Sequence, residues 1–484
     1  MMQNKLRLVS GLLAVLLLFS AAGCRKSKSG TESSDVLSGM TESDSFVSDS
    51  SDVSSETPSS GASNGSATSE NTSSLTPSKV DSLTSKNFYD DIRGTTVKIA
   101  EDNSEEIRLI IKAFEERYGC KVELTSDFSN WETKFAVQIS SGNTLDCVPV
   151  ADDRYVEYLT KGKIQPVDSY IDAKDPIWNN SVMDSHTYNG KHYVLFNNQR
   201  RYDVNWYIYY NENFFEEEGE VLPATLYQQG KWDYNAFLRT AEKMTQKSNG
   251  NTSRYGFTTN RYDLLALTNG ATLASMDTNG KATVTMNNQA TQNALQLIQD
   301  LKYKGFASYQ DNSIELFKAG QAAMVFTGPG EIGFNNNIYD KTVFPYKLGV
   351  VPTPKGPDTG NTYYAPSLQQ SSGIPAKAKN PKGAAAWVYF LGLYQKEHEN
   401  DKVMLDARRR TYSDEHLALI NSYNKNLTSI SFTVNGFGNW RGSSQKFWDE
   451  LLVDNVPPAT VTAKYVSVLQ TNVNQCIDRA MVVK

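Results

Sequence analysis

Cysteine and histidine are scarce in this chain, which contains four of each among 484 residues. No two cysteines form a Cys-x-x-Cys pair, and no histidine lies near one in the sequence. Zinc sites have such closely spaced ligands, and if Cys24 carries a lipid, the three remaining cysteines are an odd number, which does not suggest a disulfide framework. The sequence therefore predicts no metal site, no cofactor and no obvious disulfide framework among Cys120, Cys147 and Cys476.

Other features are missing as well. The net charge is −6 and the pI is near 5.5, so there is no excess of basic residues to form a nucleic-acid-binding face. Acidic residues are plentiful, but no Gly-x-Ser-x-Gly motif occurs and no histidine lies in a recognisable catalytic motif. We therefore expect a binding protein and not an enzyme, and no nucleic-acid partner.

The first 24 residues have the pattern of a bacterial export signal. Lys5 and Arg7 supply a positive start, and residues 8–19 form an apolar segment too short to span a bilayer comfortably. Residues 20–24, Ser-Ala-Ala-Gly-Cys, resemble a lipobox, in which Cys24 receives the lipid. The alternative is an ordinary signal peptide that happens to contain Cys24. We expect a lipoprotein signal peptide over residues 1–24 and a protein held at the membrane by its lipid.

A Ser- and Thr-rich segment follows, over residues 25–90. It has almost no aromatic side chains, so it cannot bury enough apolar surface to offset its chain entropy. A flexible coil of about 60 residues spans roughly 40–45 Å. The sequence therefore predicts a disordered tether that lets a folded module extend from the extracellular face of the membrane, which is typical of a Gram-positive surface.

The folded part opens with a βαβ pattern. Residues 96–100 read as a strand, residues 107–118 carry apolar side chains at helical spacing, Gly119 ends the helix, and residues 121–125 form a second strand. This order predicts a mainly parallel sheet covered by helices, the α/β class. Further expected elements are strands at 193–196, 322–326 and 348–351, and a helix capped by Asn380 with Pro381 in its first turn.

The segment 317–331 combines a helix end, a short apolar strand and a Gly-Pro-Gly turn. Proline and glycine at 328–330 cannot continue a sheet ladder, so Glu331 is expected at the carboxyl end of a strand, where ligands bind in open α/β sheets. Such junctions are also common without a function. This segment resembles the F-x-x-G-x-A-A-M-x-x-x-G signature of the extracellular solute-binding proteins of ABC importers, of the maltose-binding-protein type.

Further phrases carry the same resemblance in the same order, over roughly residues 95–480. They lie at 130–135, 141–146, 152–155, 210–215, 348–356 and 379–391. The resemblance implies a two-lobed periplasmic-binding-protein-like fold of the class II type, each lobe a mainly parallel sheet flanked by helices, with a hinge between them. It places lobe 1 at 91–208 plus 360–405, and lobe 2 at 209–359 plus 406–484.

The resemblance also implies a function. A cell-surface lipoprotein of this kind captures a carbohydrate, here expected to be an oligosaccharide, by hinge closure and delivers it to ABC permease subunits as a monomer. Alternatives are a binding or sensory lipoprotein of the same fold for a ferric ion or a peptide, and a surface adhesin. Adjacent tyrosines at 209–210 and 363–364 could mimic a ferric-ion site.

Sugars present C–H faces to aromatic rings and hydroxyl edges to carboxylates and amides. In the family, the loops after the first and third strands bind sugar hydroxyls, which points to Glu101 or Asp102 and to Asp153. The alternative for these acids is a solvated loop or a helix cap, and the strand with Trp206 and Tyr207 could instead be packed on both faces. The candidate ligand-binding residues are Asp102, Asp153, Trp206, Tyr207, Glu331, Tyr364, Gln369 and Trp440.

Overall fold

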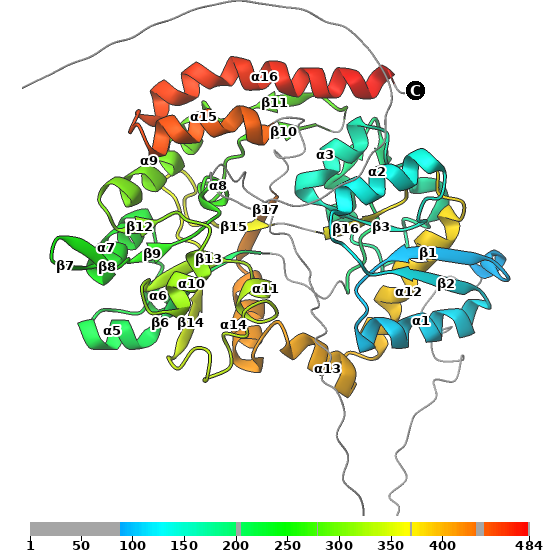
Figure 1. The fold of residues 1–484 in the computed structure, drawn as a ribbon, viewed down its shortest axis with the longest axis horizontal. Coiled ribbons are helices and arrows are strands. Elements are labelled where there is room, and N and C mark those ends of the chain that lie inside the picture. Colours follow the sequence, from blue (N-terminus) through cyan, green and yellow to red (C-terminus); the bar gives the residue numbers. More distant parts are fainter. Residues whose placement is uncertain (1–87, 200–204, 278, 368–369, 432–439, 483–484) are drawn as a thin grey trace, which may run out of the picture. The chain divides into compact units, whose positions relative to one another are not determined.

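The computed structural model describes residues 88–199, 205–277, 279–367, 370–431 and 440–482 (Figure 1). The predicted export signal with Cys24, nearly all of the predicted tether and Gln369 lie outside the described residues.

The N-terminal sheet has the order β2-β1-β3-β16. Strand β1 (Thr96–Ala100) pairs in parallel with β2 (Lys121–Thr125), and a parallel bridge from Ile99 to Cys147 leads to β3 (Val148–Ala151). Strand β16 (Gln370–Gly373) closes the sheet antiparallel to β3. Strand β16, which comes from later in the chain, therefore runs opposite to the other three strands. The parallel pair β1 and β2, with α1 between them in sequence, confirms the expected βαβ unit.

Helices α1 (Glu105–Tyr118) and α12 (Pro381–Glu397) cover this sheet. The side chain of Ser104 caps α1 by accepting from the Ile107 N–H, and Gly119 ends the helix in the left-handed conformation with φ 61°. Asn380 caps α12 by accepting from the Gly383 N–H, with Pro381 at the first helical position, as predicted. The two helices contact each other and bury their apolar faces in a common core.

A five-stranded sheet forms the second half of the fold, in the order β12-β9-β13-β6-β14. Its strands are β12 (Ala307–Ser308), β9 (Phe257–Thr258), β13 (Met324–Thr327), β6 (Tyr207–Asn211) and β14 (Leu348–Val351). Only β6 runs against the other four. Every residue of β6 is buried, so the alternative in which both of its faces are packed is confirmed.

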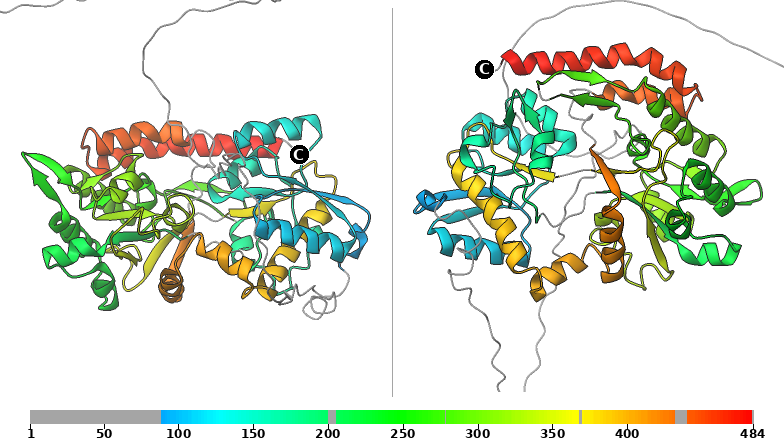
Figure 2. Two further views of the ribbon diagram at one scale, coloured as in Figure 1. Left: turned by 60° about the horizontal axis from the view of Figure 1, so that its bottom comes forward. Right: turned by 180° about the vertical axis from the view of Figure 1, so that it is seen from behind.

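Further helices and short strand pairs complete the described part of the chain. The helices are α2 (Trp131–Ser141), α3 (Asp152–Thr160), α4 (Asn180–Ser185), α5 (Glu212–Glu218), α6 (Pro223–Gln228), α7 (Tyr234–Met244), α8 (Tyr262–Leu265), α9 (Gln289–Tyr303), α10 (Ser313–Lys318), α11 (Pro329–Ile332), α13 (Lys402–Arg409), α14 (Asp414–Asn424), α15 (Trp440–Leu452) and α16 (Pro458–Val482). In the described part of the chain, 3-10 turns lie at Asp90–Ile92 and Asp168–Tyr170. Short strand pairs are β4 (Thr187–Tyr188) with β5 (Lys191–His192), β7 (Gln246–Ser248) with β8 (Asn251–Arg254), and β10 (Ala274–Met276) with β11 (Ala282–Val284). Helix α16 packs along α15 (Figure 2).

Three chain segments meet beside the start of β6. Strand β15 (Tyr363–Ser367) pairs in parallel with β17 (Leu427–Ser431), and an antiparallel bridge joins Asn205 to Ser367. The side-chain oxygen of Asn424 accepts hydrogen bonds from Asn205 Nδ2 at 3.2 Å and from Tyr207 Oη at 2.6 Å. This meeting point joins the β6 segment to two segments from later in the chain.

The prediction of a strand over residues 193–196 is wrong. Val194 and Leu195 are fully buried, but Leu195 makes only an isolated antiparallel bridge to Ser372, and strand β5 has ended at His192. These apolar side chains are therefore explained by burial in the core, and the segment does not form a strand.

Candidate functional site

The candidate site lies at one edge of the five-stranded sheet, where each of its strands has one terminus. Strands β9, β12, β13 and β14 end there, and β6 begins there because it runs the opposite way, with Tyr207 opposite Thr327. Loops at the carboxyl ends of strands are the usual ligand positions in an open α/β sheet. Trp206, Arg261 and the turn after β13 therefore form one candidate site.

Trp206 is the aromatic side chain at this edge. Its backbone N–H donates to the Pro366 carbonyl at 2.8 Å, which fixes the residue beside β15. Its half-buried indole packs against Phe326 with ring centroids 5.3 Å apart. Gly328 lies beside the indole, since a Cβ there would be 3.4 Å from Nε1. The ring is thus held by its neighbours while part of it faces solvent.

Arg261 lies beside this indole, with its guanidinium carbon 5.7 Å from the ring centroid. Asp263 accepts from Arg261 Nε at 3.0 Å and from Nη2 at 3.2 Å, a bidentate pair. Thr259 Oγ1 accepts from the Arg261 N–H and donates to the Phe326 carbonyl, so it joins the ends of β9 and β13. Arg261 and Asp263 were not identified from the sequence, because they follow a strand of only two residues.

Glu331 and Tyr364 have local partners. Glu331 lies on α11, and its two carboxylate oxygens accept from Asn335 Nδ2 at 2.7 Å and from Asn336 Nδ2 at 3.2 Å. The half-buried ring of Tyr364 lies against Gly270, where a Cβ would be 2.8 Å from Cε2. These contacts give Glu331 a role in closing its own turn and give Tyr364 a role in packing.

Tyr207 has no exposed ring face in this structure. It is 0% exposed within an apolar cluster, and its hydroxyl donates to Asn424. It pairs with Thr327 of β13 at the start of β6, and its burial depends on tertiary contacts that the sequence alone does not reveal. We therefore leave Tyr207 out of the proposed site.

Replacing Tyr207 with phenylalanine should lower the free energy of unfolding by about 1 kcal/mol, because it removes one buried hydrogen bond. Ligand affinity should stay unchanged, since the ring remains in the core. Chemical denaturation and titration calorimetry of the same samples measure both quantities. A loss of affinity at unchanged stability would instead make Tyr207 a ligand contact.

The acidic residues predicted for the N-terminal sheet have mixed outcomes. Asp102 follows β1, and its Oδ1 accepts from the Ser104 N–H at 2.9 Å, which is the local turn that precedes helix α1. Asp153 lies in the first turn of α3 and Trp440 begins α15, but the side chains of both lie outside the described part of the chain. Their predicted roles therefore remain predictions.

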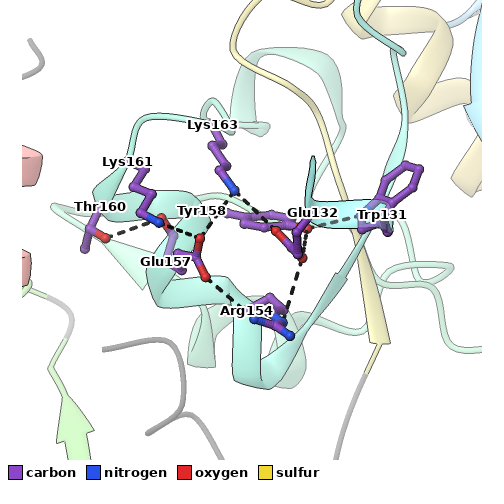
Figure 3. A network of polar contacts seen from close by, with 8 residues as sticks. All are labelled: Trp131, Glu132, Arg154, Glu157, Tyr158, Thr160, Lys161 and Lys163. Carbon is purple, nitrogen blue, oxygen red and sulfur yellow. Dashed lines mark hydrogen bonds and ion pairs between the residues drawn. The ribbon is translucent and has the colours of Figure 1, made fainter. Parts of the chain in front are cut away.

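A polar network joins the first turn of α2 to the last turn of α3 and to Lys163 just after it (Figure 3). Tyr158 Oη donates to Glu132 at 2.7 Å and accepts from Trp131 Nε1 at 3.2 Å. Lys163 Nζ lies 3.3 Å from Glu132 and 3.4 Å from Glu157, and 4.6 Å from the centroid of the Tyr158 ring. The network borders an open hollow of about 840 Å³ between the two helices. It ties the start of α2 to the end of α3.

Asp152 and His186 form a buried pair directly beside this edge. His186 Nε2 lies 2.9 Å from Asp152 Oδ1, and Nδ1 lies 2.9 Å from both the Val182 carbonyl, which can only accept, and the Ser185 hydroxyl. A charged ring donates from Nε2 to Asp152 and from Nδ1 to the carbonyl, whereas a neutral ring can instead accept at Nδ1 from Ser185. Burial by itself lowers the pKa of His186, but the hydrogen bond and charge of Asp152, with the Val182 carbonyl, raise that pKa above its ordinary value. The pair anchors the start of α3 to the end of α4.

Replacing His186 with glutamine should destabilise the protein by about 1–2 kcal/mol in mild acid, because glutamine can donate to Asp152 but brings no charge. A raised folded-state pKa means that this stabilisation is fully present below about pH 6.5 and is lost as the pH rises through the folded pKa. The stability difference between wild type and H186Q should therefore shrink towards pH 9 in denaturation series. A difference that is constant with pH would contradict a charged His186.

Among the described residues, no group of three or more His, Cys, Asp or Glu side chains is arranged to hold a metal ion. Within the same ranges, no helix is long and apolar enough to cross a membrane.

The family model for bacterial extracellular solute-binding proteins matches residues 100–393, which is more than half of the chain. This chain belongs to that family. The family is extracellular and binds solutes, so the expectations of an extracellular location and of a binding protein that is not an enzyme are confirmed. A search of curated proteins finds no match to this solute-binding protein.

Solved structures support the fold. The ABC substrate-binding protein Lmo0181 from Listeria monocytogenes, in complex with cycloalternan, has a TM-score of 0.58 at 18% identity and covers 80% of this chain and 99% of its own. The GacH receptor of Streptomyces glaucescens, studied unliganded and with acarbose, has a TM-score of 0.57 at 18% identity, covering 79% and 99%. UgpB from Mycobacterium tuberculosis, in complex with glycerophosphocholine, has a TM-score of 0.58 at 14% identity, covering 79% and 99%. The expected two-lobed α/β fold of this solute-binding protein is therefore confirmed.

Proposed function

We propose that this solute-binding protein captures a carbohydrate, in particular an oligosaccharide, between two lobes by hinge closure and delivers it to an ABC permease. The observation that carries the proposal is the half-buried Trp206 beside the charged Arg261–Asp263 pair at the carboxyl edge of the five-stranded sheet. An aromatic surface next to a donor–acceptor pair matches a sugar, which has an apolar face and a hydroxyl edge. Carbohydrate ligands in the related structures of Listeria and Streptomyces support the same class.

The segments that meet at Asn205, Asn424 and Ser367 are the proposed hinge. Each connects the neighbourhood of β6 to a different part of the sequence, so a small rotation there would move one lobe against the other. A ligand that contacts both lobes favours the closed state by its extra contacts. The lobe boundaries given above, attachment through Cys24, a Gram-positive surface and a monomeric state are parts of the same proposal.

A ferric-ion site of adjacent tyrosines is the less favoured candidate. Tyr209 and Tyr210 are buried in the core. Burial raises the pKa of Tyr210 above its ordinary value, and burial followed by the charges of Tyr227 and Asp233 raises the pKa of Tyr363 to about 12. Phenolate ligands would therefore be costly to form at these positions.

Thermal-shift screening of the full chain against mono- and oligosaccharides tests the proposal. A ligand at 100 times its Kd should stabilise the protein by about 2.7 kcal/mol. Glycerophosphocholine, a ferric salt and a peptide mixture belong in the same plate. Stabilisation by an oligosaccharide supports the proposal, whereas stabilisation by one of the other solutes alone would contradict it.

A further inference from the structure

Helix α16 contacts both parts of the fold. It packs on α15, on β11 and on α9, which precedes β12 of the five-stranded sheet, and it also contacts α3, which follows β3 of the N-terminal sheet. Val473 and Ile477, near the end of α16, belong to the same apolar cluster as Tyr155 and Leu159 of α3. The helix therefore links the two sheets at a place other than the segments that meet at Asn205.

Gly280, two residues before β11, makes a second contact of this kind. A Cβ at this position would lie 2.1 Å from Cε2 and 2.7 Å from Cδ2 of Tyr188, so the backbone lies directly on the tyrosine ring. Tyr188 belongs to β4 and is only 6% exposed. Gly280 also has φ 81°, which side chains other than glycine rarely adopt. Glycine therefore permits both the turn and the close approach to the ring.

The two contacts are tied to each other on both sides. The side chain of Gln470, on α16, accepts from the Val284 N–H at 2.8 Å and donates to the Ala282 carbonyl at 3.0 Å, which fixes β11 to α16. On the opposite side, Tyr155 of α3 donates to the carbonyl of His186 at 2.7 Å, directly before β4. The unit of α16 and β11 therefore meets the unit of α3 and β4 as one surface.

We propose that these contacts form a clasp, in which Gly280 and Tyr188 hold the closed state of the protein and slow the release of its ligand. The inference rests on the proposed capture of a carbohydrate between two lobes. In the proposed lobes, α3 and β4 belong to lobe 1, and β11 and α16 belong to lobe 2. Tyr155 lies in the first turn of α3, at the carboxyl end of β3, which is the end where ligands bind in open α/β sheets. The clasp therefore joins the lobes on the ligand side.

A hinge rotation that moves the lobes apart on that side separates Gly280 from the Tyr188 ring. It also exposes the apolar surface that the clasp buries. A contact made only in the closed state shifts the population towards that state and raises the apparent affinity of a ligand that the closed state retains. Neither residue has to touch the ligand for this effect, so both are positioning residues.

The experiment compares Gly280→Ala with a matched control, Gly250→Ala. The new methyl group in G280A overlaps the Tyr188 ring and forces the clasp apart. Gly250 has φ 80° in the turn between β7 and β8, but no atom lies within 4 Å of a Cβ there. Both variants therefore carry a similar backbone strain, and only G280A loses a contact between the lobes.

Full chains of wild type and both variants are titrated with maltotetraose, cellotetraose and mannotriose, and sugar binding and release are followed by stopped-flow fluorescence. The affinity of G280A should be about fivefold lower or more, as for an ordinary coupling between distant positions. The loss should appear in the dissociation rate, while the association rate stays that of G250A. A merely structural role of Gly280 would lower the melting temperature without this change in the dissociation rate.

Tyr188→Ala tests whether the two residues act as a pair. This variant removes the ring atoms that the methyl group of G280A would meet, and it should itself weaken binding by faster release. Adding G280A to Y188A should then change the affinity by less than about twofold. Melting curves check folding. Gly280→Asn with Gly250→Asn repeats the comparison if alanine is not tolerated, because asparagine adopts positive φ more readily.

The outcomes separate the clasp from the proposed function. A G280A protein that binds and releases sugar like G250A overturns the clasp and leaves carbohydrate capture standing. Tighter binding by G280A overturns it as well, since the contact would then favour the open state. A wild type that binds none of the sugars overturns the proposed function, and the inference falls with it. Faster release in G280A and in Y188A, with no further loss in the double variant, supports the inference.

Discussion

Replacing Trp206 with alanine should weaken carbohydrate binding by about 5- to 30-fold. A half-exposed aromatic side chain contributes about 1–2 kcal/mol by area burial, and each 1.4 kcal/mol corresponds to about tenfold in Kd. The effect should appear mainly in the dissociation rate, because the indole contacts the ligand only after docking. Its neighbours Phe326 and Pro366 lie on strands β13 and β15 and should keep their places.

Titration calorimetry and a melting curve on the same sample measure this effect. Tyr303→Ala is the matched control, since Tyr303 is a large aromatic at the end of α9 and is 42% exposed. Y303A should bind like the wild type. If W206A bound its ligand with unchanged affinity while remaining folded, Trp206 would be a packing residue and the site would lie elsewhere.

Replacing Gly256 with alanine should destabilise the protein by about 3 kcal/mol or more, at the upper end of the range for overpacked cores. A Cβ at this position would lie 1.8 Å from the carbonyl oxygen of Ala241 and 2.7 Å from its Cα. These are backbone atoms of helix α7, so no side-chain rotation can relieve the overlap. The helix itself would have to move away from the entry to β9.

Urea denaturation of G256A against wild type measures the loss. Gly330→Ala is the control, because no atom lies within 4 Å of a Cβ at that position, and its stability should stay within about 0.5 kcal/mol. A G256A protein as stable as G330A would show that α7 does not pack against this segment as closely as described.

Elements governed by local signals could be predicted from the sequence. Helix α1 has its cap, its apolar spacing and its terminal Gly119 within sixteen consecutive residues, and α12 carries Asn380 and Pro381 at its start. Each of these signals acts between neighbours in the chain, so no knowledge of the tertiary structure was needed. The parallel βαβ unit followed from the same local information.

The site required non-local information. The two-residue strands β9 and β12 are too short to be recognised from the sequence and are defined by the pairing of β9 with β12 and β13. The loop that carries Arg261 therefore could not be predicted to follow a strand. Tyr207 differs from Trp206 because it pairs with Thr327 of β13 and is buried in an apolar cluster, whereas Trp206 precedes the strand. Alternation along the sequence cannot tell an aromatic ring in the centre of a sheet from one at its edge.

Small-angle X-ray scattering with and without a saturating oligosaccharide tests the central claim most directly. Capture between two lobes predicts that the radius of gyration of the folded part, in a variant that begins at residue 88, falls when the sugar binds and rises again when it is dialysed away unchanged. A bound sugar that leaves the radius of gyration constant, or one that is recovered as a cleaved product, would contradict the account.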